Sequence, residues 1–335
     1  MAGSLADVAR RAGVSIATAS RALNGSRHPV STAVRERVLE AAKEIGYAPS
    51  ALARALVTRR SRIIGVIVGD IVDPYFAEIT RGAEDVARRE GYLTIVCNTD
   101  RAPATELAYL RLLRDYQAEG VIFAGGGFVG EGDASVLVDA VERARADGVR
   151  VVSIATRPFE SMRVSVDNRA AAYDITSYMI SIGHRRIAFV EGPAGLTTTA
   201  DRLAGFVQAM TSVGLDATLI HPGNFDYESG QAAALRMVGR ALPDAIIGAN
   251  DESAIGVLMT LRQAGVLVPD EVSVAGIDDT RASRFVDLTT VSVPMYELGA
   301  IAARRILEPP PGGTGRTILP HRLVPRSTTM RRDSA

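Results

Sequence analysis

The sequence contains one cysteine and four histidines among 335 residues, and it has no long apolar run. The single cysteine, Cys97, excludes a disulfide within one chain, and its place in the apolar run Tyr92 to Cys97 favours a buried thiol over a nucleophile. No uninterrupted apolar stretch is long enough to span a bilayer, and the first residues have no apolar signal-peptide core. We therefore expect a cytoplasmic protein that is not exported and binds no membrane.

One thiol and four imidazoles provide few candidates for a catalytic nucleophile, a general base or a metal ligand. They show neither paired metal-ligand spacing nor a nucleophile beside a base, so we predict no metal, no cofactor and no enzyme activity. The segment Gly125 to Gly130 does satisfy the G-x-G-x-x-G pattern of a dinucleotide site. It follows the third strand of its series, however, and the next strand ends at Ile154 to Arg157 without an acid for a ribose hydroxyl. A nicotinamide-dependent oxidoreductase is thus the weaker alternative to a glycine loop at the rim of a cleft.

The chain has no net charge, but its charges are unevenly distributed. Residues 1–62 carry eleven basic against four acidic side chains, a net charge of +7, and the remaining residues carry 27 against 34, a net charge of −7. Neutralising backbone phosphates supplies most non-specific affinity for DNA, so a basic head on an acidic body fits a head that binds nucleic acid. A basic face that is merely solvated is the alternative.

Two short helices joined by a tight turn are predicted near the start of the chain. The first, Leu5 to Ala12, has apolar residues at helical spacing, and Ser4 and Asp7 are spaced as a capping box. Gly13 can adopt the left-handed conformation that ends this helix, and Ser15 is a good N-cap for the second. This is the geometry of a helix-turn-helix, whose second helix enters the major groove of DNA. A small helical hairpin in an ordinary domain is the alternative.

The exposed side of the second helix, which runs from Ile16 to about Leu23, would read the bases. Arg21 is the first candidate, because a guanidinium can bond O6 and N7 of guanine together. A third helix is predicted from a cap at Ser31 to Gly46, which completes a three-helix head. After it, Pro49 starts a short helix that would be marginal alone in water and would form with a partner.

From Ile63 onward, short apolar strands alternate with helices, a pattern that predicts parallel sheets with helices on both faces. A first series covers Ile63 to Ile154, and a second covers Arg169 to Ala275. Two doubly wound halves of similar size imply a cleft between them, and ligands of such sheets bind at the carboxyl ends of the strands. Short strands at Thr317 to Leu319 and Arg322 to Val324 follow in the tail.

Six segments of the head stand out as motifs: Leu5–Ala9, Ala12–Ser15, Thr18–Gly25, Arg35–Leu39, Gly46–Pro49 and Ala53–Leu56. Together they closely resemble the head of the lactose/galactose repressor family, with Ala19 where the family more often has valine. The resemblance implies DNA contacts at Ser15, Ile16, Ala17, Thr18, Ser20, Arg21, Asn24, Ala53 and Leu56. Among these, Leu56 would wedge into the minor groove at the operator centre and kink it.

The body contains seven further motifs: Asp73–Ile79, Asp167–Asn168, Gly183–Ala188, Arg202–Phe206, Asn250–Asp251, Gly276–Asp279 and Leu288–Val291. They are similar to the family's periplasmic-binding-protein-like core. The resemblance implies an all-α head at residues 3–47, a hinge helix and linker at 48–62, and an α/β core of two doubly wound subdomains at 63–335. The first subdomain would comprise about 63–157 plus 291–312, and the second about 158–290 plus 313–331.

The same resemblance implies an effector site between the subdomains. Its residues are expected to be Phe76, Asp167, Arg202, Phe225, Asn250 and Asp278. Arginine, asparagine and aspartate can bind vicinal hydroxyls, and aromatic rings can pack on the apolar face of a sugar. Taken singly, Arg202 also fits an interdomain ion pair, and Phe225 also fits a core position.

These expectations predict a DNA-binding transcription regulator, specifically a repressor of carbohydrate-use genes controlled by a sugar or sugar derivative. A homodimer would bind a near-palindromic double-stranded operator, because a two-fold protein requires two half-sites. Leucine heptads that would make a tetramer are missing from the tail. Control by a purine-like corepressor or by a partner protein is the alternative, and the sign of the effector's action is left open.

Overall fold

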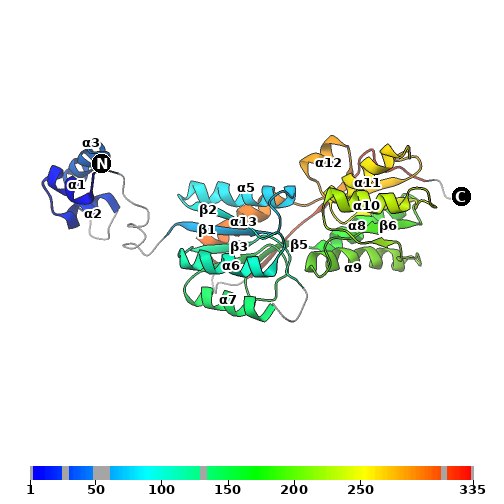
Figure 1. Cartoon of the computed structure of the whole chain (residues 1–335), viewed down its shortest axis with the longest axis horizontal. Helices are drawn as coiled ribbons and strands as arrows, with labels where there is room; N and C mark the ends of the chain where they lie inside the picture. Colours follow the sequence, from blue (N-terminus) through cyan, green and yellow to red (C-terminus); the bar gives the residue numbers. More distant parts are fainter. Residues whose placement is uncertain (1–2, 25–29, 48–60, 129–133, 311–314, 333–335) are drawn as a thin grey trace. The chain divides into compact units, whose positions relative to one another are not determined.

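The computed structural model describes residues 3–24, 30–47, 61–128, 134–310 and 315–332. The chain divides into two compact units, a head unit that ends at Arg62 and a core unit that begins at Ile63 (Figure 1). Among the described helices, none combines the length and the apolar character needed to cross a membrane. The helix expected after Pro49 falls outside the described residues.

The described residues of the head unit form three helices, α1 (Leu5–Ala12), α2 (Ile16–Asn24) and α3 (Thr32–Glu44). The predicted capping box on α1 is confirmed. The Asp7 N–H donates to Ser4 Oγ at 3.3 Å, and the Ser4 N–H donates to the Asp7 carboxylate at 3.0 Å. Gly13 has a φ of 65°, in the left-handed region, and ends the helix as expected.

The turn into α2 and the packing of α3 complete the head. The Thr18 N–H donates to Ser15 Oγ at 3.1 Å, which is the expected N-cap bond. Ser31 precedes α3 as predicted, but its side chain makes no capping bond there. Val8, Ala19 and Val38, one from each helix, are fully buried together. The head therefore has an apolar core of its own.

The first lobe of the core unit is a six-stranded parallel sheet in the order β11-β5-β4-β3-β1-β2. Its strands are β1 (Ile63–Val68), β2 (Leu93–Asn98), β3 (Gly120–Phe123), β4 (Arg150–Ser153), β5 (Met162–Val166) and β11 (Gly315–Leu319). Helices α5 (Pro74–Arg89) and α13 (Met295–Leu307) cover one face, and α6 (Pro103–Asp115) and α7 (Ala134–Ala146) cover the other (Figure 1). Val66 packs toward α5 and Ile67 toward α6, because successive side chains of a strand point to opposite faces.

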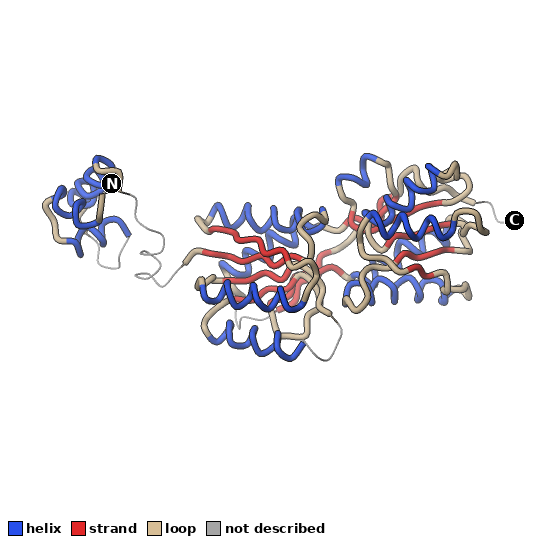
Figure 2. The backbone as a smooth tube through the Cα atoms, in the orientation of Figure 1, coloured by secondary structure: helices blue, strands red, loops and turns tan. Residues whose placement is uncertain are grey.

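The second lobe repeats this architecture of a sheet between helices (Figure 2). Its strand order is β12-β10-β9-β8-β6-β7. Its strands are β6 (Ile187–Val190), β7 (Ile220–His221), β8 (Ala245–Gly248), β9 (Ser273–Asp278), β10 (Thr289–Ser292) and β12 (Arg322–Val324), which is antiparallel to β10. Its helices are α8 (Asn168–Ser181), α9 (Thr197–Ser212), α10 (Tyr227–Met237), α11 (Asp251–Gln263) and the short α12 (Arg281–Phe285). The side chains of α8 and α9 pack on one face, and those of α10 and α11 pack on the other.

The described chain passes between the lobes three times, after β5, after β10 and after β11. The crossing after β10 returns the chain to the first lobe, where β11 pairs with β5 in the first sheet. The expected subdomain boundaries, which gave residues from 158 and from 313 to the second subdomain, differ from this strand order. The reason is local: Arg163, Ser165 and Arg316 interrupt the apolar runs that mark the other strands.

Candidate functional site

A pocket lies between the two lobes of the core unit, at the carboxyl ends of the strands of both sheets. The first lobe contributes residues that follow β1, β2, β3 and β4: Gly69, Asp73, Tyr75, Phe76, Thr99, Arg101, Ala102, Glu106, Gly125, Gly126, Phe128 and Arg157. The second lobe contributes Leu196, Thr198, Arg202, Phe225, Asn250 and Asp278, which follow or end β6, β7, β8 and β9. This is where doubly wound sheets bind their ligands.

Arg202, on α9, is the central cation of the second-lobe wall. Its Nη2 donates to Asp278 Oδ1 at 3.0 Å, its Nε donates to Asn168 Oδ1 at 3.0 Å, and its Nη1 donates to the carbonyl of Ala249. The guanidinium also lies over the Phe225 ring, with 5.7 Å to the ring centroid. Only 4% of the Arg202 side chain is exposed, so these bonds hold the guanidinium in one orientation at the pocket surface.

Asp278 is the carboxylate of the same wall, at the end of β9. Its burial raises the pKa of the carboxyl group, even though the Arg202 guanidinium beside it acts in the opposite direction. Its φ of 133° and the φ of 60° at Phe225 place two non-glycine residues in the left-handed half of backbone space. Such strain persists where the surrounding structure enforces it, and here it lies at the pocket.

Asn250 joins Phe225 to the start of α11. Its Oδ1 accepts from the Ser253 N–H at 3.0 Å and thereby caps the helix, and its Nδ2 donates to the Phe225 carbonyl at 2.9 Å. Phe225 itself is 91% buried by its surroundings, with 9% of its surface exposed. The aromatic ring and the amide are therefore positioned by the same hydrogen-bonded turn.

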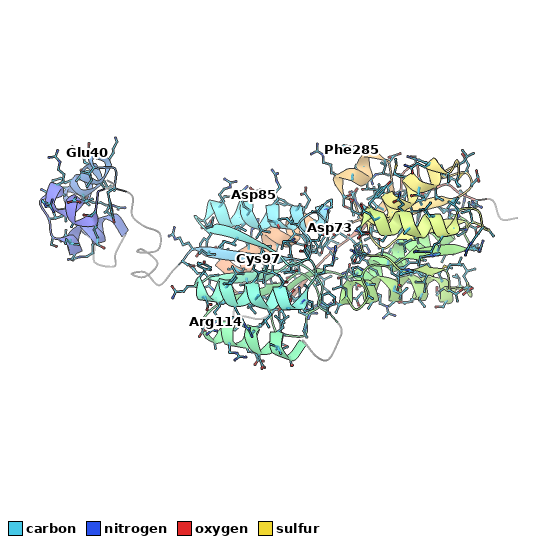
Figure 3. The ribbon with its side chains drawn as sticks, viewed as in Figure 1. Glu40, Asp73, Asp85, Cys97, Arg114 and Phe285 are labelled. Atoms are coloured by element: carbon cyan, nitrogen blue, oxygen red, sulfur yellow. The ribbon has the colours of Figure 1, made fainter. Side chains whose placement is uncertain are left out.

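Asp73 and Arg101 form the first charged pair on the first-lobe wall. Asp73 caps α5 by accepting from the Tyr75 N–H at 3.0 Å, and Arg101 lies 3.5 Å from Asp73 Oδ2 and 3.5 Å from Asp70 Oδ2. Burial raises the pKa of Asp73 to about 6, against the opposing effects of the Tyr75 N–H and Arg101. Figure 3 labels Asp73 on the side of the first lobe that lies nearest the second.

Arg157 and Glu106 form the second charged pair on this wall. Nη1 of Arg157 lies 2.7 and 2.9 Å from the two Glu106 oxygens, and Nε donates to the Gly125 carbonyl at 2.9 Å. The guanidinium is also 5.1 Å from the centroid of the Phe123 ring. With 4% of its side chain exposed, Arg157 is a fixed part of the wall.

Direct backbone contacts connect the two lobes beside the pocket. Phe128 and Leu196 form an antiparallel β-bridge, and the Thr197 N–H donates to the Gly127 carbonyl at 2.9 Å. The Thr197 hydroxyl donates to the Thr156 carbonyl at 3.2 Å. The expected glycine loop at the rim is thus, in its described part, a point of contact between the lobes.

Five of the six predicted effector residues line this pocket: Phe76, Arg202, Phe225, Asn250 and Asp278. Asp167 does not belong with them. It is exposed and caps α8, with its Oδ1 accepting from the Ala170 N–H at 2.9 Å, so it is not among the lining residues and its effector contact stays a prediction. Asp73, Arg101, Glu106 and Arg157 also line the pocket and are not among the site residues predicted from the sequence. A signal was available for Asp73, Arg101 and Arg157, since each follows the end of a strand within a few residues.

The predicted DNA-reading face is the outer side of α2. Ser15, Ile16, Ala17 and Arg21 are exposed, whereas Thr18 and Ser20 are half-buried. The Arg21 Nε donates to the Ala17 carbonyl at 3.1 Å, so the arginine lies along its own helix. The side chain of Asn24 and the whole of Ala53 and Leu56 lie outside the described residues.

Among the described residues, no group of three or more histidine, cysteine, aspartate or glutamate side chains could hold a metal ion. Cys97 is buried, as the sequence predicts, and burial raises the pKa of its thiol, which disfavours the reactive thiolate.

Comparisons with known proteins agree with this architecture. The family model described as "Bacterial regulatory proteins, lacI family" matches residues 4–50, and that of the "Periplasmic binding protein-like domain" matches residues 176–329. The chain is 34% identical over 336 residues to catabolite control protein A of Priestia megaterium, covering 96% of this chain and 98% of the relative.

Solved structures show the same fold. A lac repressor dimer bound to operator and the anti-inducer ONPF is 24% identical with a TM-score of 0.85, covering 98% of this chain and 100% of that one. A complex of the transcriptional regulator CelR with cellobiose is 29% identical with a TM-score of 0.69, covering 97% of this chain and 99% of that one. The chain therefore belongs to the LacI family and is a DNA-binding transcriptional regulator with a ligand-binding core.

Proposed function

We propose that this regulator is a homodimeric repressor of carbohydrate-use genes whose affinity for operator DNA is set by a sugar or sugar derivative. The pocket between the lobes would hold the effector. One observation carries this proposal: Arg202, Asn250 and Asp278 converge with Phe76 and Phe225 on a single pocket, in a chain that also has a helix-turn-helix head.

The chemistry of these side chains suits a polyhydroxylated ring. A hydroxyl can donate to the Asp278 carboxylate and accept from Arg202 or Asn250, and neighbouring hydroxyls can do both at once. The rings of Phe76 and Phe225 offer apolar surface for the C–H face of a sugar. The cellobiose bound by the CelR relative supports this class of effector.

On DNA, the proposal assigns base reading to α2 and its flanks. Ser15, Ile16, Ala17, Thr18, Ser20, Arg21 and Asn24 would contact the major groove, with Ala53 and Leu56 of the hinge in the minor groove. Two heads of a homodimer would bind the two halves of a near-palindromic operator. The operator-bound dimer of the lac repressor supports this arrangement by analogy of fold.

Effector and operator would be coupled through the arrangement of the two lobes. Because the pocket takes its walls from both lobes, a ligand that contacts both favours one arrangement of them. If operator DNA favours a different arrangement, each ligand must weaken the binding of the other by the same factor. An effector that prefers the operator-bound arrangement would act as a corepressor instead.

The experiment is a thermal unfolding scan of the full chain against sugars, sugar derivatives and nucleobases, followed by operator titration with each compound that binds. A ligand at about 100 times its Kd should add about 2.7 kcal/mol of stability to the state it binds. Arg202→Gln should abolish the shift. Arg236→Gln, at an exposed arginine on α10, is the matched control and should leave it intact.

Other outcomes would replace parts of the proposal. A shift with a nucleobase and none with any sugar would favour a purine-like corepressor. No shift with any compound would favour control by a partner protein, and a sugar shift that leaves operator affinity unchanged would remove the coupling.

A further inference from the structure

The charged side chains that line the pocket restrict the chemical class of the effector more narrowly than the shape of the pocket does. Three arginines line the pocket, Arg101, Arg157 and Arg202, and each has a carboxylate within ion-pair distance. The separations are 3.5 Å for Arg101 to Asp73, 2.7 Å for Arg157 to Glu106 and 3.0 Å for Arg202 to Asp278. Each arginine in the described part of the lining is thus already paired with a carboxylate of the protein.

Two of the arginines are also bound to backbone or amide oxygens. Arg157 donates its Nε hydrogen to the Gly125 carbonyl, and Arg202 donates to the Ala249 carbonyl and to Asn168 Oδ1. A guanidinium has five N–H groups in a fixed planar fork, and the paired oxygens here occupy much of that fork. The N–H groups that remain can donate to single oxygens such as hydroxyls. A bidentate clamp on a phosphate would require the carboxylate to leave.

The lining has as many carboxylates as arginines, namely Asp73, Glu106 and Asp278 beside Arg101, Arg157 and Arg202, and two further carboxyl groups lie behind it. Asp70 shares Arg101 with Asp73, at 3.5 Å. Glu252, on α11, has a buried Oε1 without a hydrogen-bond partner among the described residues. Burial and then the negative charge of Asp73 raise the pKa of Glu252, so these two carboxyl groups repel each other. Because the arginines and carboxylates of the described lining balance, and Asp70 and Glu252 add no positive charge, this region offers an anion no net attraction.

We propose that the effector is uncharged: a polyhydroxylated compound without a phosphate, sulfate or carboxylate group. This inference rests on the proposed function, since it describes the ligand of the same pocket. A phosphate ester carries a charge of about −1.5 to −2 near neutral pH and would meet Asp73, Glu106 or Asp278 at close range. A hydroxyl donates to the same carboxylates and keeps all three ion pairs intact.

The first test compares matched pairs of ligands on the full chain. Thermal unfolding and calorimetric titration at about pH 8, where more of the carboxyl groups are ionised, would use neutral sugars and polyols beside their phosphate esters and uronic acids. We expect a neutral compound to bind and its anionic counterpart to bind at least about tenfold more weakly, a difference of about 1.4 kcal/mol.

Two results would count against the inference, and they are distinguishable. Tighter binding of a phosphate ester or uronic acid than of its neutral counterpart would overturn the uncharged effector and leave the proposed sugar-controlled regulator standing. Failure of every sugar, neutral or anionic, to bind would overturn the proposed function and this inference with it.

The second test releases an arginine from its carboxylate. Glu106→Gln should allow Arg157 to bind an anion, so inorganic phosphate should raise the midpoint of thermal unfolding of this variant relative to sodium chloride at equal ionic strength. The wild type and Glu297→Gln, at an exposed glutamate of α13, should show no such phosphate effect. A phosphate effect in the wild type that Arg157→Gln removes would overturn the inference.

Should Glu106→Gln fail to fold, because it leaves a buried guanidinium unpaired, Asp73→Asn provides the same comparison at Arg101. Asparagine is also a good N-cap, so this variant keeps the start of α5. We expect weaker discrimination against phosphate than in the wild type. Unchanged discrimination in both variants would show that these carboxylates do not exclude anions.

Discussion

Asp73 has three roles at one position: it caps α5, pairs with Arg101 and lines the pocket. Its pKa of about 6 lies above that of an unfolded aspartate because the site is buried. Folded protein therefore holds this proton more tightly than unfolded protein does. The contribution of Asp73 to stability is greatest at low pH and declines as the pH rises from about 4 to about 6.

The first prediction concerns the pH dependence of effector binding. A ligand hydroxyl that donates to Asp73 favours the ionised carboxylate, so binding should release a proton at about pH 6. If the bound carboxyl returns to its ordinary pKa, affinity should rise about tenfold between about pH 5 and pH 7. Calorimetry in buffers of different ionisation enthalpy measures the proton, and Asp73→Asn should flatten the profile. The same slope in Asp73→Asn would assign the proton to another group.

The second prediction concerns Arg21, which is exposed on α2. Arg21→Ala should abolish the preference for operator over random DNA, because a bidentate contact to guanine is worth about 1–3 kcal/mol of discrimination. Fluorescence anisotropy with both DNAs measures the ratio. The thermal shift caused by effector is the control and should persist. Loss of both responses would mean that the substitution unfolds the protein rather than removing a base contact.

The ion pairs of the pocket show that the pairing of side chains from distant segments cannot be predicted from single residues. Arg202 and Asp278 could each be proposed as site residues because both lie in recognisable motifs, Arg202–Phe206 and Gly276–Asp279. Their pairing joins α9 to β9, and the pairing of Arg157 with Glu106 joins the loop after β4 to α6. No spacing in the sequence encodes such contacts, because they arise only when the sheet brings separate strand ends together. The charge balance of the pocket was therefore inaccessible before the fold was known.

At the scale of elements, helices and strands were predicted well where the local sequence carries clear capping or apolar patterns. The helix α1 has a capping box, an apolar stripe and a terminating glycine, and its bounds were predicted closely. The strands β1 and β6 are uninterrupted apolar runs. By contrast, β5 alternates apolar with polar residues, β11 begins with Gly315, Arg316 and Thr317, and α13 follows a crossing between lobes without a distinctive start. Their place in the first sheet depends on long-range pairing.

The third prediction concerns the contact between the glycine loop and the start of α9. A Cβ at Gly126 would lie 2.7 Å from Thr198 Oγ1 and 3.0 Å from Thr197 Oγ1, so Gly126→Ala should push the lobes apart at this point. Effector affinity should fall. Adding Thr198→Ala removes the closest atom and should restore part of the loss, which a double-mutant cycle measures. Additive losses would instead mean that the two residues act independently on the ligand.

At the scale of the whole molecule, the head and the core carry opposite net charge, +7 and −7. The head therefore has the electrostatic character of a DNA-binding unit, and the core should add no general attraction to DNA. The two binding activities of one chain should then respond differently to salt.

The fourth prediction follows from this separation. Operator affinity should fall steeply and linearly on a logarithmic plot as salt rises, because each neutralised phosphate releases condensed counterions. Affinity for an uncharged effector, measured in the same buffers, should change little. A steep salt dependence of effector binding would indicate a charged ligand, and a flat operator titration would argue against phosphate contacts by the head.

The three crossings between the lobes also bear on how the protein is made. One edge strand of each sheet, β11 in the first and β12 in the second, lies within residues 315–324, close to the end of the described chain. During synthesis, all the helices of both lobes leave the ribosome before either sheet can be completed. The first lobe must also wait for α13, which is made after nearly the whole second lobe. The head, with its core contained in residues 3–47, has no such requirement and can fold while the core is still being translated.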